Sequence, residues 1–362
     1  MKSTNKPKVL ILASGQFGYS TTTFKHCEFA ADEFDITYIG WDYDLPKIEL
    51  PTVNQIYVSR KYNKVMRNVK LLQSFHNEIR KGYDVVFVNY FRGSSLIKLA
   101  NLKAKFMIYV DTLGVMSGPL KRRIYNSIMR FELFFFKNIS MISEGIGKKI
   151  GLKEFKVLPL GGDCYATDQK TYEPLSLLYV GTLGGRRVQD CVKGFHQFLE
   201  NSKATGANSN ATFTIIGDSK DNDLSEIRTY VKANKLEKSI FTTGFLHRDK
   251  LAPYFAKSNV GVSYVPITPH YQHQPPTKTF EYLISGLHVI ATATDANKAI
   301  VSKTAGVLIN DTADSFQEGL LELWQRKPEL DSIALRKEYA QYTWKRVVDE
   351  KFKPLVREAL NA

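Results

Sequence analysis

The stretch Gln274–Thr294, QPPTKTFEYLISGLHVIATAT, decides the fold because it places a helix directly before a buried strand. Its two prolines stiffen the approach and fit just ahead of a helix start. After Gly286 comes a run of small and β-branched residues, as in a strand that is buried on both faces. A helix that leads straight into such a strand is typical of an α/β sheet.

The same alternation of short apolar runs and amphipathic stretches continues on both sides of this segment. It predicts parallel sheets that are covered on both faces by helices. The pattern lapses at residues 160–174, where glycines, polar residues and a proline cluster as at a linker. We therefore predict an α/β protein with two Rossmann-like, doubly wound domains, residues 1–163 and 164–343, that face a central cleft.

We expect a C-terminal helix at about 344–362 to pack back on the first domain. Ligands of such sheets bind at the carboxyl ends of the strands, so the motifs should directly follow strands. The predicted strands are residues 8–13, 35–41, 84–88, 106–110, 177–180, 213–216, 240–243, 260–264 and 289–291. The predicted helices are residues 22–33, 65–81, 188–200, 224–234 and 344–360.

Composition limits the classes of protein to consider. The chain has 362 residues, 43% of them hydrophobic, which suits two ordinary domain cores. No apolar run reaches the length of about 18 residues that a membrane span needs, and the short N-terminal apolar segment reads as a first strand. Three scattered cysteines favour a reducing cytosol. The net charge of +14 implies attraction to nucleic acid, anionic lipid or a phosphorylated substrate.

Two glycine-containing loops follow predicted strands. Gly15-x-x-Gly18 would let a backbone approach a phosphate, or it is a tight turn. Its spacing is not GxGxxG, and no acid ends the second strand, so a nicotinamide cofactor is not expected. In the second loop, Gly181-Thr-Leu-Gly-Gly-Arg186-Arg187, the two arginines would offer paired donors to a diphosphate, or they are solvated surface residues.

The opening segment offers three further candidates. Thr277 would cap the helix, whose first-turn N–H groups would hold phosphate oxygens. Glu281 lies one turn beyond Thr277, where a carboxylate can accept two hydrogen bonds from a vicinal diol such as a ribose. Lys278 stands beside them. The alternative is an ordinary helix with a surface Lys and Glu.

Here the sequence resembles a known family. TKTFEYLISGLHVIAT looks like the donor-binding segment of retaining glycosyltransferases of family 4, which have the GT-B fold. YVGTL, FTIIGD, FTTGFLHRDKLAPYFAKSNVGVSYVP and YTWKRVV agree in order and spacing. The resemblance covers essentially all of the second domain and only fold and position in the first.

The resemblance implies a donor site for a nucleotide-diphosphate sugar. Glu281 matches the ribose-binding second glutamate of the family's E-x7-E pair, whereas His273 stands where the first glutamate is expected. Arg186, Arg187 and Lys278 would neutralise the diphosphate, and Thr182 follows the strand glycine. Gly217 and the Gly244–Leu246 loop, with Phe245 and Leu246, resemble the nucleoside pocket.

In the first domain, Asp111 ends a strand at a position where relatives often place a His or Asp that faces the sugar. It would contact sugar hydroxyls, or it caps a helix. Asp111, Arg186 and Lys278 are the catalytic candidates, and Gly15 and Gly18 complete the donor-binding set. The resemblance implies retention of anomeric configuration by a front-face route, in which the leaving phosphate helps to deprotonate the acceptor.

We expect no metal and no cofactor, the nucleotide sugar of UDP or GDP type being the substrate. Asp42-x-Asp44 and Asp221-x-Asp223 read DxD, the metal pattern of the other major glycosyltransferase fold, but both triplets lie outside the motif frame above. His270 and His273 read HxxH, but the sequence offers no convincing further ligands for zinc.

Residues 119–149 hold seven Lys or Arg and two Glu, with Ile124, Ile128, Phe131, Phe134 and Phe135 near one helical stripe. A basic amphipathic helix of this kind lies on anionic membrane, or it packs on the core with a solvated basic face. We expect membrane contact, because the acceptor would be a lipid-linked or polysaccharide glycan. The expected location is therefore cytoplasmic, peripheral on the inner face of the cell membrane.

Two other functions stay open. One is a nucleotide-sugar epimerase or hydrolase on the same fold. The other is a basic nucleic-acid-binding protein, for which no RNA- or DNA-binding motif is present, so nucleic acid is not an expected partner.

Overall fold

The computed structural model describes residues 6–114, 118–205, 210–269 and 271–361. The chain forms two compact units. The first contains residues 1–160 and 344–362, and the second contains residues 161–343. The C-terminal segment is thus part of the first unit, and the division falls within the stretch of glycines and polar residues that interrupts the sequence pattern.

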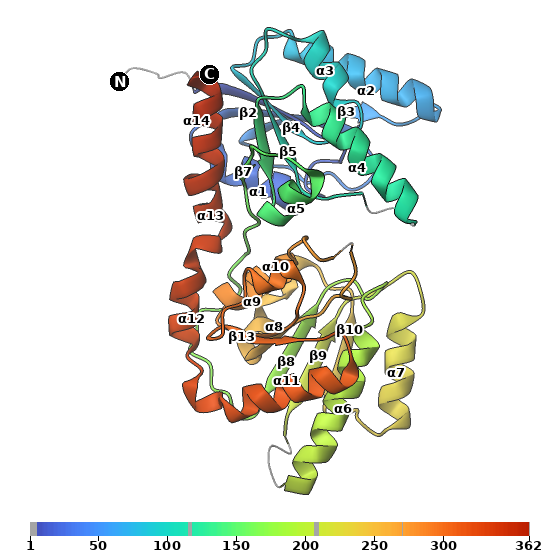
Figure 1. The fold of residues 1–362 in the computed structure, drawn as a ribbon, viewed down its shortest axis with the longest axis vertical. Helices are drawn as coiled ribbons and strands as arrows, with labels where there is room; N and C mark the ends of the chain where they lie inside the picture. The colour runs from blue at the N-terminus through green and yellow to red at the C-terminus, as the bar shows by residue number, and fades with distance from the viewer. Residues whose placement is uncertain (1–5, 115–117, 206–209, 270, 362) are drawn as a thin grey trace. The chain divides into compact units, whose positions relative to one another are not determined.

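The first unit is built on a seven-stranded parallel sheet in the order β3-β2-β1-β4-β5-β6-β7 (Figure 1). Strand β1 is the apolar run KVLIL, and its last four residues are fully buried, as expected for a central strand that is covered on both faces. The strands are β1 (Lys8–Leu12), β2 (Asp35–Asp42), β3 (Val53–Ser59), β4 (Val85–Asn89), β5 (Phe106–Val110), β6 (Asn138–Met141) and β7 (Lys156–Val157).

Helices cover both faces of this sheet. Crossovers between parallel strands are right-handed, so the connections that run towards β3 and towards β7 lie on opposite faces. Helix α1 shares its face with the C-terminal helices, and α2, α3 and α4 lie on the other face (Figure 1). The helices are α1 (Thr21–Ala30), α2 (Lys64–Ile79), α3 (Ser94–Ala100), α4 (Pro119–Leu133), α5 (Glu144–Ile150), α13 (Trp344–Val347) and α14 (Lys353–Asn361).

Two sequence expectations for the first unit need correction. The edge strand β3, VNQIYVS, was not predicted because its polar residues dilute the apolar pattern. Residues 119–149 do not form one basic helix, since α4 ends at Leu133 and the buried end of β6 separates it from α5. Phe134 and Phe135 therefore lie just beyond α4 rather than on its stripe.

The C-terminal segment docks on α1 through aromatic packing. A π-helical turn, Val348–Phe352, joins α13 to α14 just before Pro354. The ring of Phe352 stacks on buried His26 at a centroid distance of 4.5 Å. Lys353 adds ion pairs to Asp32 at 2.8 Å and to Asp349 at 2.6 Å. The segment thus completes the core of the first unit.

The second unit has a six-stranded parallel sheet in the order β10-β9-β8-β11-β12-β13. Its strands are β8 (Ser176–Val180), β9 (Thr212–Ile216), β10 (Ile240–Gly244), β11 (Val260–Ser263), β12 (His288–Thr292) and β13 (Gly306–Ile309). Its helices are α6 (Val188–Thr205), α7 (Asp223–Ala233), α8 (Ala252–Lys257), α9 (Thr277–Ile284), α10 (Asp295–Lys298), α11 (Ala313–Gln325) and α12 (Ser332–Tyr339). The prediction of two doubly wound parallel-sheet domains is confirmed.

Five elements of the second unit were not predicted, namely β13 and the helices α8, α10, α11 and α12. Strand β13, GVLI, is only four residues long, and α11 pairs with α6 across one face of the sheet. Phe213 from β9 packs on Phe195 of α6 and Phe316 of α11, with ring centroids 5.6 Å and 6.3 Å apart. In the described part of the chain, no helix is long and apolar enough to cross a bilayer.

Candidate functional site

Three glycines bring the carboxyl ends of β8, β9 and β10 together. The N–H of Gly181 donates to the carbonyl of Ile216 at 3.0 Å, and the N–H of Gly217 donates to the carbonyl of Gly244 at 2.9 Å. A Cβ on Gly217 would lie 1.8 Å from the carbonyl oxygen of Gly181, and its φ of 156° is one that side chains rarely adopt. Only glycine fits here, so it allows the ends of β8 and β9 to approach each other closely.

The loop that follows β8 holds its two arginines in different ways. The guanidinium of Arg186 lies 4.5 Å from the ring centroid of Tyr271, a cation–π contact that orients it without neutralising it. Arg187 instead pairs with Asp190 at 2.7 Å and with Asp311 at 3.3 Å. Arg186 is therefore the stronger candidate to bind a diphosphate. Arg187 is instead held in ion pairs within the fold.

Thr182 begins the same loop. Its carbonyl accepts a hydrogen bond from the Tyr179 hydroxyl at 2.7 Å, and the side chain is exposed at the strand end. The N–H of Leu183 donates to the carbonyl of Asp218 at 3.1 Å, so the loops after β8 and β9 are tied together. This tie fixes the position of Arg186 relative to Gly217.

Helix α9 presents its first turn at the same edge, because it lies between β11 and β12 in the chain and packs on both. Its N-cap is Pro276, with no side-chain cap, so the expectation that Thr277 caps the helix is wrong: Thr277 is the first helical residue. The hydroxyl of Thr279 is 2.6 Å from that of Ser263 on β11, which anchors the helix start to the sheet.

Lys278 and Glu281 form an ion pair with each other. Glu281 is only 3% exposed, more buried than a surface helix residue would be. A buried carboxylate is retained in a fold where a cation or hydrogen-bond donors satisfy it. The pair thus holds a carboxylate and an ammonium group together one turn into the helix, next to the glycine edge.

The segment before the second sheet completes the surroundings of this pair, although its sequence pattern indicates only a linker. A Cβ on Gly162 would lie 2.9 Å from the backbone nitrogen of Glu281, so a larger residue would displace the helix. The Tyr165 ring lies 5.8 Å from the Lys278 ammonium, and the Tyr165 N–H donates to Ser285 Oγ at 3.0 Å. In the sequence, the only indication of this role is that an aromatic residue, Tyr165, stands within a stretch of glycines and polar residues.

The remaining candidates of the second unit lie on loops around this edge. Phe245, directly after β10, is 76% exposed, although it is a large apolar side chain, and Leu246 behind it packs against the core. An exposed ring beside glycine-lined strand ends offers a stacking surface for a base. His273 lies 3.5 Å from Asp295 of α10, a carboxylate that the sequence analysis had not linked to it.

In the first unit, Gly15, Gly18 and Asp111 also follow strand ends. Gly15 accepts a hydrogen bond from the Tyr38 hydroxyl at 2.9 Å, and Gly18 has a φ of 87° and packs on Ile48. Gln16 between them is buried and donates to the carbonyl of Leu45 at 2.8 Å. This loop is therefore held by the chain itself as a tight turn, whereas Asp111 is exposed at the end of β5.

Neither DxD triplet has the surroundings of a metal site. Asp42 pairs with Lys47 at 2.7 Å, and Asp223 accepts hydrogen bonds from Ser219 and Gln189. Among the described residues, no group of three or more His, Cys, Asp or Glu is placed to hold a metal ion. His270 lies outside the described residues.

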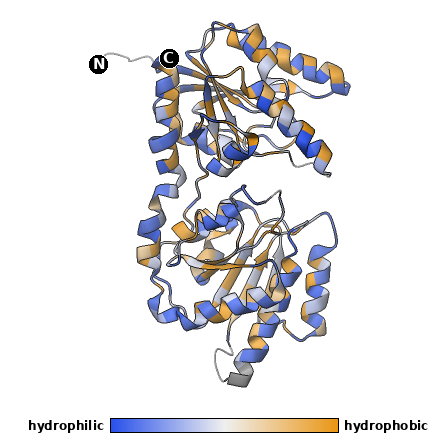
Figure 2. Cartoon of the chain, in the orientation of Figure 1, coloured by the Kyte–Doolittle hydropathy of each residue, from blue (hydrophilic) through white to orange (hydrophobic). Residues whose placement is uncertain are grey.

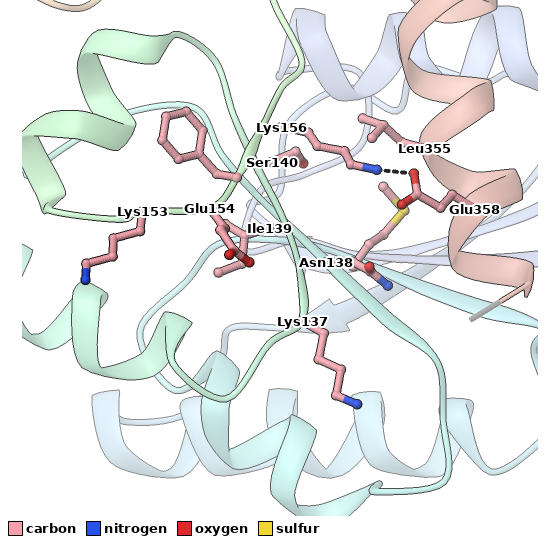
Figure 3. Close-up of a pocket in the computed structure, with 11 residues that line it drawn as sticks. Lys137, Asn138, Ile139, Ser140, Lys153, Glu154, Lys156, Leu355 and Glu358 are labelled. Carbon is pink, nitrogen blue, oxygen red and sulfur yellow. Dashed lines mark hydrogen bonds and ion pairs between the residues drawn. The ribbon is translucent and has the colours of Figure 1, made fainter.

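A separate pocket of about 440 Å³ lies at the opposite, amino edge of the first sheet (Figure 3). Residues from the starts of β5, β6 and β7 line it together with α14, and Lys156 pairs with Glu358 across it. It contains none of the candidate residues and lies away from strand carboxyl ends, so we do not assign the reaction to it.

Residues 174–326 match the model of the family described as glycosyl transferases group 1. That segment holds β8 to α11, and so the glycine edge, Arg186 and α9. No curated protein sequence matches the chain.

Solved structures agree in fold over almost the whole chain. Sucrose-phosphate synthase from Thermosynechococcus elongatus matches with a TM-score of 0.73 at 14% identity, covering 98% of this chain and 100% of that one. A glycosyltransferase from Rickettsia africae matches with a TM-score of 0.74 at 15% identity, covering 98% and 99%. HepE from Anabaena, in complex with UDP, matches with a TM-score of 0.72 at 12% identity, covering 97% and 100%. The fold is thus the GT-B fold, and the group 1 match indicates a glycosyltransferase.

Proposed function

We propose that this protein is a retaining glycosyltransferase of family 4, which moves a sugar from a nucleotide-diphosphate donor to an acceptor hydroxyl. The proposal is supported by the segments that follow the strands of the second unit, which carry the glycines of β8 to β10, Arg186 and the Lys278–Glu281 pair. Backbone N–H groups and cations at one edge suit a diphosphate, and a carboxylate beside them suits a ribose diol. The group 1 match over the same residues supports it.

The chemistry asks for compensation of charge on the leaving diphosphate. Arg186 and Lys278 would supply cationic hydrogen-bond donors, and the first turn of α9 would add N–H groups and the positive end of its dipole. When the donor binds, the ribose hydroxyls would donate hydrogen bonds to the Glu281 carboxylate. The Lys278 ammonium group would then leave Glu281 and bind the phosphate. We propose that this compensation needs no metal and that Asp111 contacts sugar hydroxyls from the first unit.

The donor that we propose is of UDP or GDP type, and HepE, one of the structures of the same fold, is described in complex with UDP. The proposed acceptor is a lipid-linked or polysaccharide glycan. We further propose that the enzyme works in the cytoplasm, on the inner face of the cell membrane, with residues 119–149 in contact with the anionic leaflet.

A thermal-shift panel tests the donor site first. UDP, GDP, ADP, CMP and their sugars are added to the wild type with and without EDTA. A ligand at 100 times its dissociation constant adds about 2.7 kcal/mol to the free energy of unfolding. One diphosphate should stabilise the wild type in EDTA, and Glu281→Ala and the isosteric Glu281→Gln should lose that response.

The matched control is Glu318→Ala, at an exposed glutamate of α11 in the same unit. Each variant is compared with its own ligand-free midpoint, because removal of Glu281 also leaves Lys278 without its partner. A response to no nucleotide, or an unchanged response in both Glu281 variants, would refute the donor site. A response that EDTA abolishes would refute the metal-free arrangement.

A further inference from the structure

Positive charge is concentrated in one part of the chain. Residues 60–137 contain sixteen Lys or Arg and four Asp or Glu, so they carry a net charge of +12 out of the chain's formal +14. The four acids of this segment are few, and most of them are occupied within the fold. Glu78 and Glu132 are buried, and Asp84 accepts a hydrogen bond from the N–H of Lys8. The segment spans α2, α3 and α4.

The same three helices, and the residues directly after α3 and α4, expose large apolar side chains. Phe134 and Phe131 are 84% and 64% exposed, and Val65 at the start of α2 is 74% exposed. Hydrophobic and hydrophilic residues alternate along α2, α3 and α4 (Figure 2). The exposed apolar set is Val65, Met66, Val69, Leu96, Leu99, Leu102, Leu120, Ile124, Phe131 and Phe134.

The fold places this set on a single face of the first sheet. Helix α3 contacts both α2 and α4, and the C-terminal segment covers the other face (Figure 1). None of residues 61–70 or 118–128 is buried, so the first turns of α2 and α4 stand clear of the sheet. We call the outer surface of α2, α3 and α4, with the ten apolar residues above, the basic-apolar face.

The basic-apolar face is rigidly attached, because Glu132 ties α4 to its neighbours. Its carboxylate accepts hydrogen bonds from the Tyr90 hydroxyl at 2.7 Å, the Gly93 N–H at 2.7 Å and Ser95 Oγ at 3.2 Å. Tyr90 follows β4, and Gly93 and Ser95 begin α3. The helices thus present their outer residues as one preformed surface.

We infer that the basic-apolar face is a docking surface for an anionic lipid bilayer. Lys and Arg beside such a bilayer are each worth about 1 kcal/mol, and apolar side chains at the same surface enter the boundary between headgroups and acyl chains. This deepens the membrane contact proposed for residues 119–149 by adding α2 and α3, and its failure would leave the donor reaction untouched.

The apolar residues favour lipid over the other polyanion, nucleic acid. Phosphate groups of a nucleic acid account for the Lys and Arg, but they give no reason to expose eight aliphatic residues, which offer no surface for stacking on bases. A second copy of the chain is disfavoured by charge, because residues 60–137 carry a net charge of +12 in each copy and would repel each other.

Flotation with lipid vesicles tests the inference on the full chain. Vesicles of phosphatidylcholine with phosphatidylglycerol are compared with vesicles of phosphatidylcholine alone, at low and at high salt. The charge variant is Lys121→Ser with Arg123→Ser, and its control is Lys232→Ser with Lys238→Ser in the second unit. The apolar variant is Phe131→Ser with Phe134→Ser, and its control is Phe241→Ser, which is 45% exposed on β10.

We expect the wild type to float only with anionic vesicles and to dissociate at high salt. The charge variant should bind about fivefold more weakly for each removed charge, and the apolar variant at least about tenfold more weakly. Both controls should bind like the wild type. Every variant should keep the wild-type thermal response to nucleoside diphosphates, since Arg186, Lys278 and Glu281 lie in the other unit.

Three results would overturn the inference. The first is absence of binding to anionic vesicles, and the second is equal binding of wild type and both variants. The third is that vesicle binding is absent and the wild type instead self-associates or binds a random oligonucleotide. If the variants abolish that other interaction, the basic-apolar face belongs to a second copy of the chain or to nucleic acid, respectively. Because the substituted residues are exposed, loss of fold is checked by the unchanged thermal midpoint of each variant.

Discussion

Lys278 and Glu281 illustrate how single residues combine two tasks in the second unit. Their ion pair satisfies a carboxylate that is almost completely buried, so each is needed for the fold before any ligand arrives. The same two groups are those that a diphosphate and a ribose diol would bind. Substitution of either one therefore changes stability as well as binding, and the two effects must be measured separately.

The two adjacent arginines give the sharpest prediction for individual residues. Arg186→Ala should weaken nucleoside-diphosphate binding about tenfold or more, because a charged donor to phosphate is lost. Arg187→Ala should change the affinity less than about threefold, since its guanidinium pairs with Asp190 and Asp311. Isothermal titration calorimetry with the nucleotide found by the thermal panel measures both. Equal losses would contradict the division of roles.

Gly217 supports a prediction about backbone packing. Gly217→Ala should lower the free energy of unfolding by at least about 2 kcal/mol, because the new Cβ collides with the Gly181 carbonyl. Gly184→Ala is the control in the neighbouring loop, where the nearest atom would be 3.4 Å away, and it should cost no more than about 1 kcal/mol. Urea denaturation compares the two, and a larger loss for Gly184→Ala would count against this geometry.

At the scale of elements, the C-terminal segment encloses a buried histidine. Phe87, Tyr109, Trp344 and Phe352 surround His26, and in the described part of the chain neither of its ring nitrogens has a hydrogen-bond partner. Burial lowers the pKa of His26 to about 3. The folded protein therefore keeps this imidazole neutral, whereas the unfolded chain protonates it at its ordinary pKa of about 6.5.

Docking of the C-terminal segment should consequently depend on pH. Above pH 6.5 His26 is neutral in both states, and between pH 6.5 and 3 only the unfolded chain takes up the proton, so stability falls by a few kcal/mol as pH falls. His26→Phe should flatten this part of the curve of stability against pH. His247→Gln, at an exposed histidine, is the control. An unchanged slope in His26→Phe would contradict the prediction.

The attachment of α4 gives a second prediction at this scale. Glu132→Ala should lower the free energy of unfolding by about 3 kcal/mol, because Tyr90, Gly93 and Ser95 would lose a buried acceptor together. Glu132→Gln, which keeps an acceptor oxygen, should lose about half as much. Urea denaturation of both variants provides the measurement, and a loss under about 1 kcal/mol for Glu132→Ala would show that α4 is held in another way.

At the scale of the whole molecule, the two units differ in how the chain builds them. The second is continuous, residues 161–343, whereas the first needs residues 344–362 from the far end of the chain. We expect residues 161–343 alone to fold and to keep the thermal response to the nucleoside diphosphate. Residues 1–160 alone should not fold stably, because Phe87, Tyr109 and His26 would lose their cover.

Circular dichroism and the thermal panel test both fragments, and a mixture of residues 1–160 with a peptide of residues 344–362 is the control for the first. Cooperative unfolding of residues 1–160 without the peptide would show that the segment is dispensable. Loss of the nucleotide response from a folded fragment 161–343 would show that the donor site needs the first unit.

The sequence alone determined the alternating α/β architecture, because buried parallel strands require continuous apolar runs such as KVLIL and VGVS. It also predicted the loop after a strand that holds Arg186 and the helix that holds Glu281, whereas Phe245 was named through the family resemblance. It missed the strands β3, β6, β7 and β13 and the role of Tyr165, since very short strands, mixed polar composition and glycine-rich stretches carry no clear periodic signal.

Only the tertiary structure decided which charges pair and which side chains stay exposed. The adjacent residues Arg186 and Arg187 look equivalent in sequence. Only Arg187, however, forms an ion pair with Asp311, which lies far along the chain. Likewise, the amphipathic pattern of α4 fits a core-packed helix as well as a docking surface, and only the packing around it shows Phe131 and Phe134 uncovered. Such outcomes depend on contacts between distant residues, which local sequence patterns do not record.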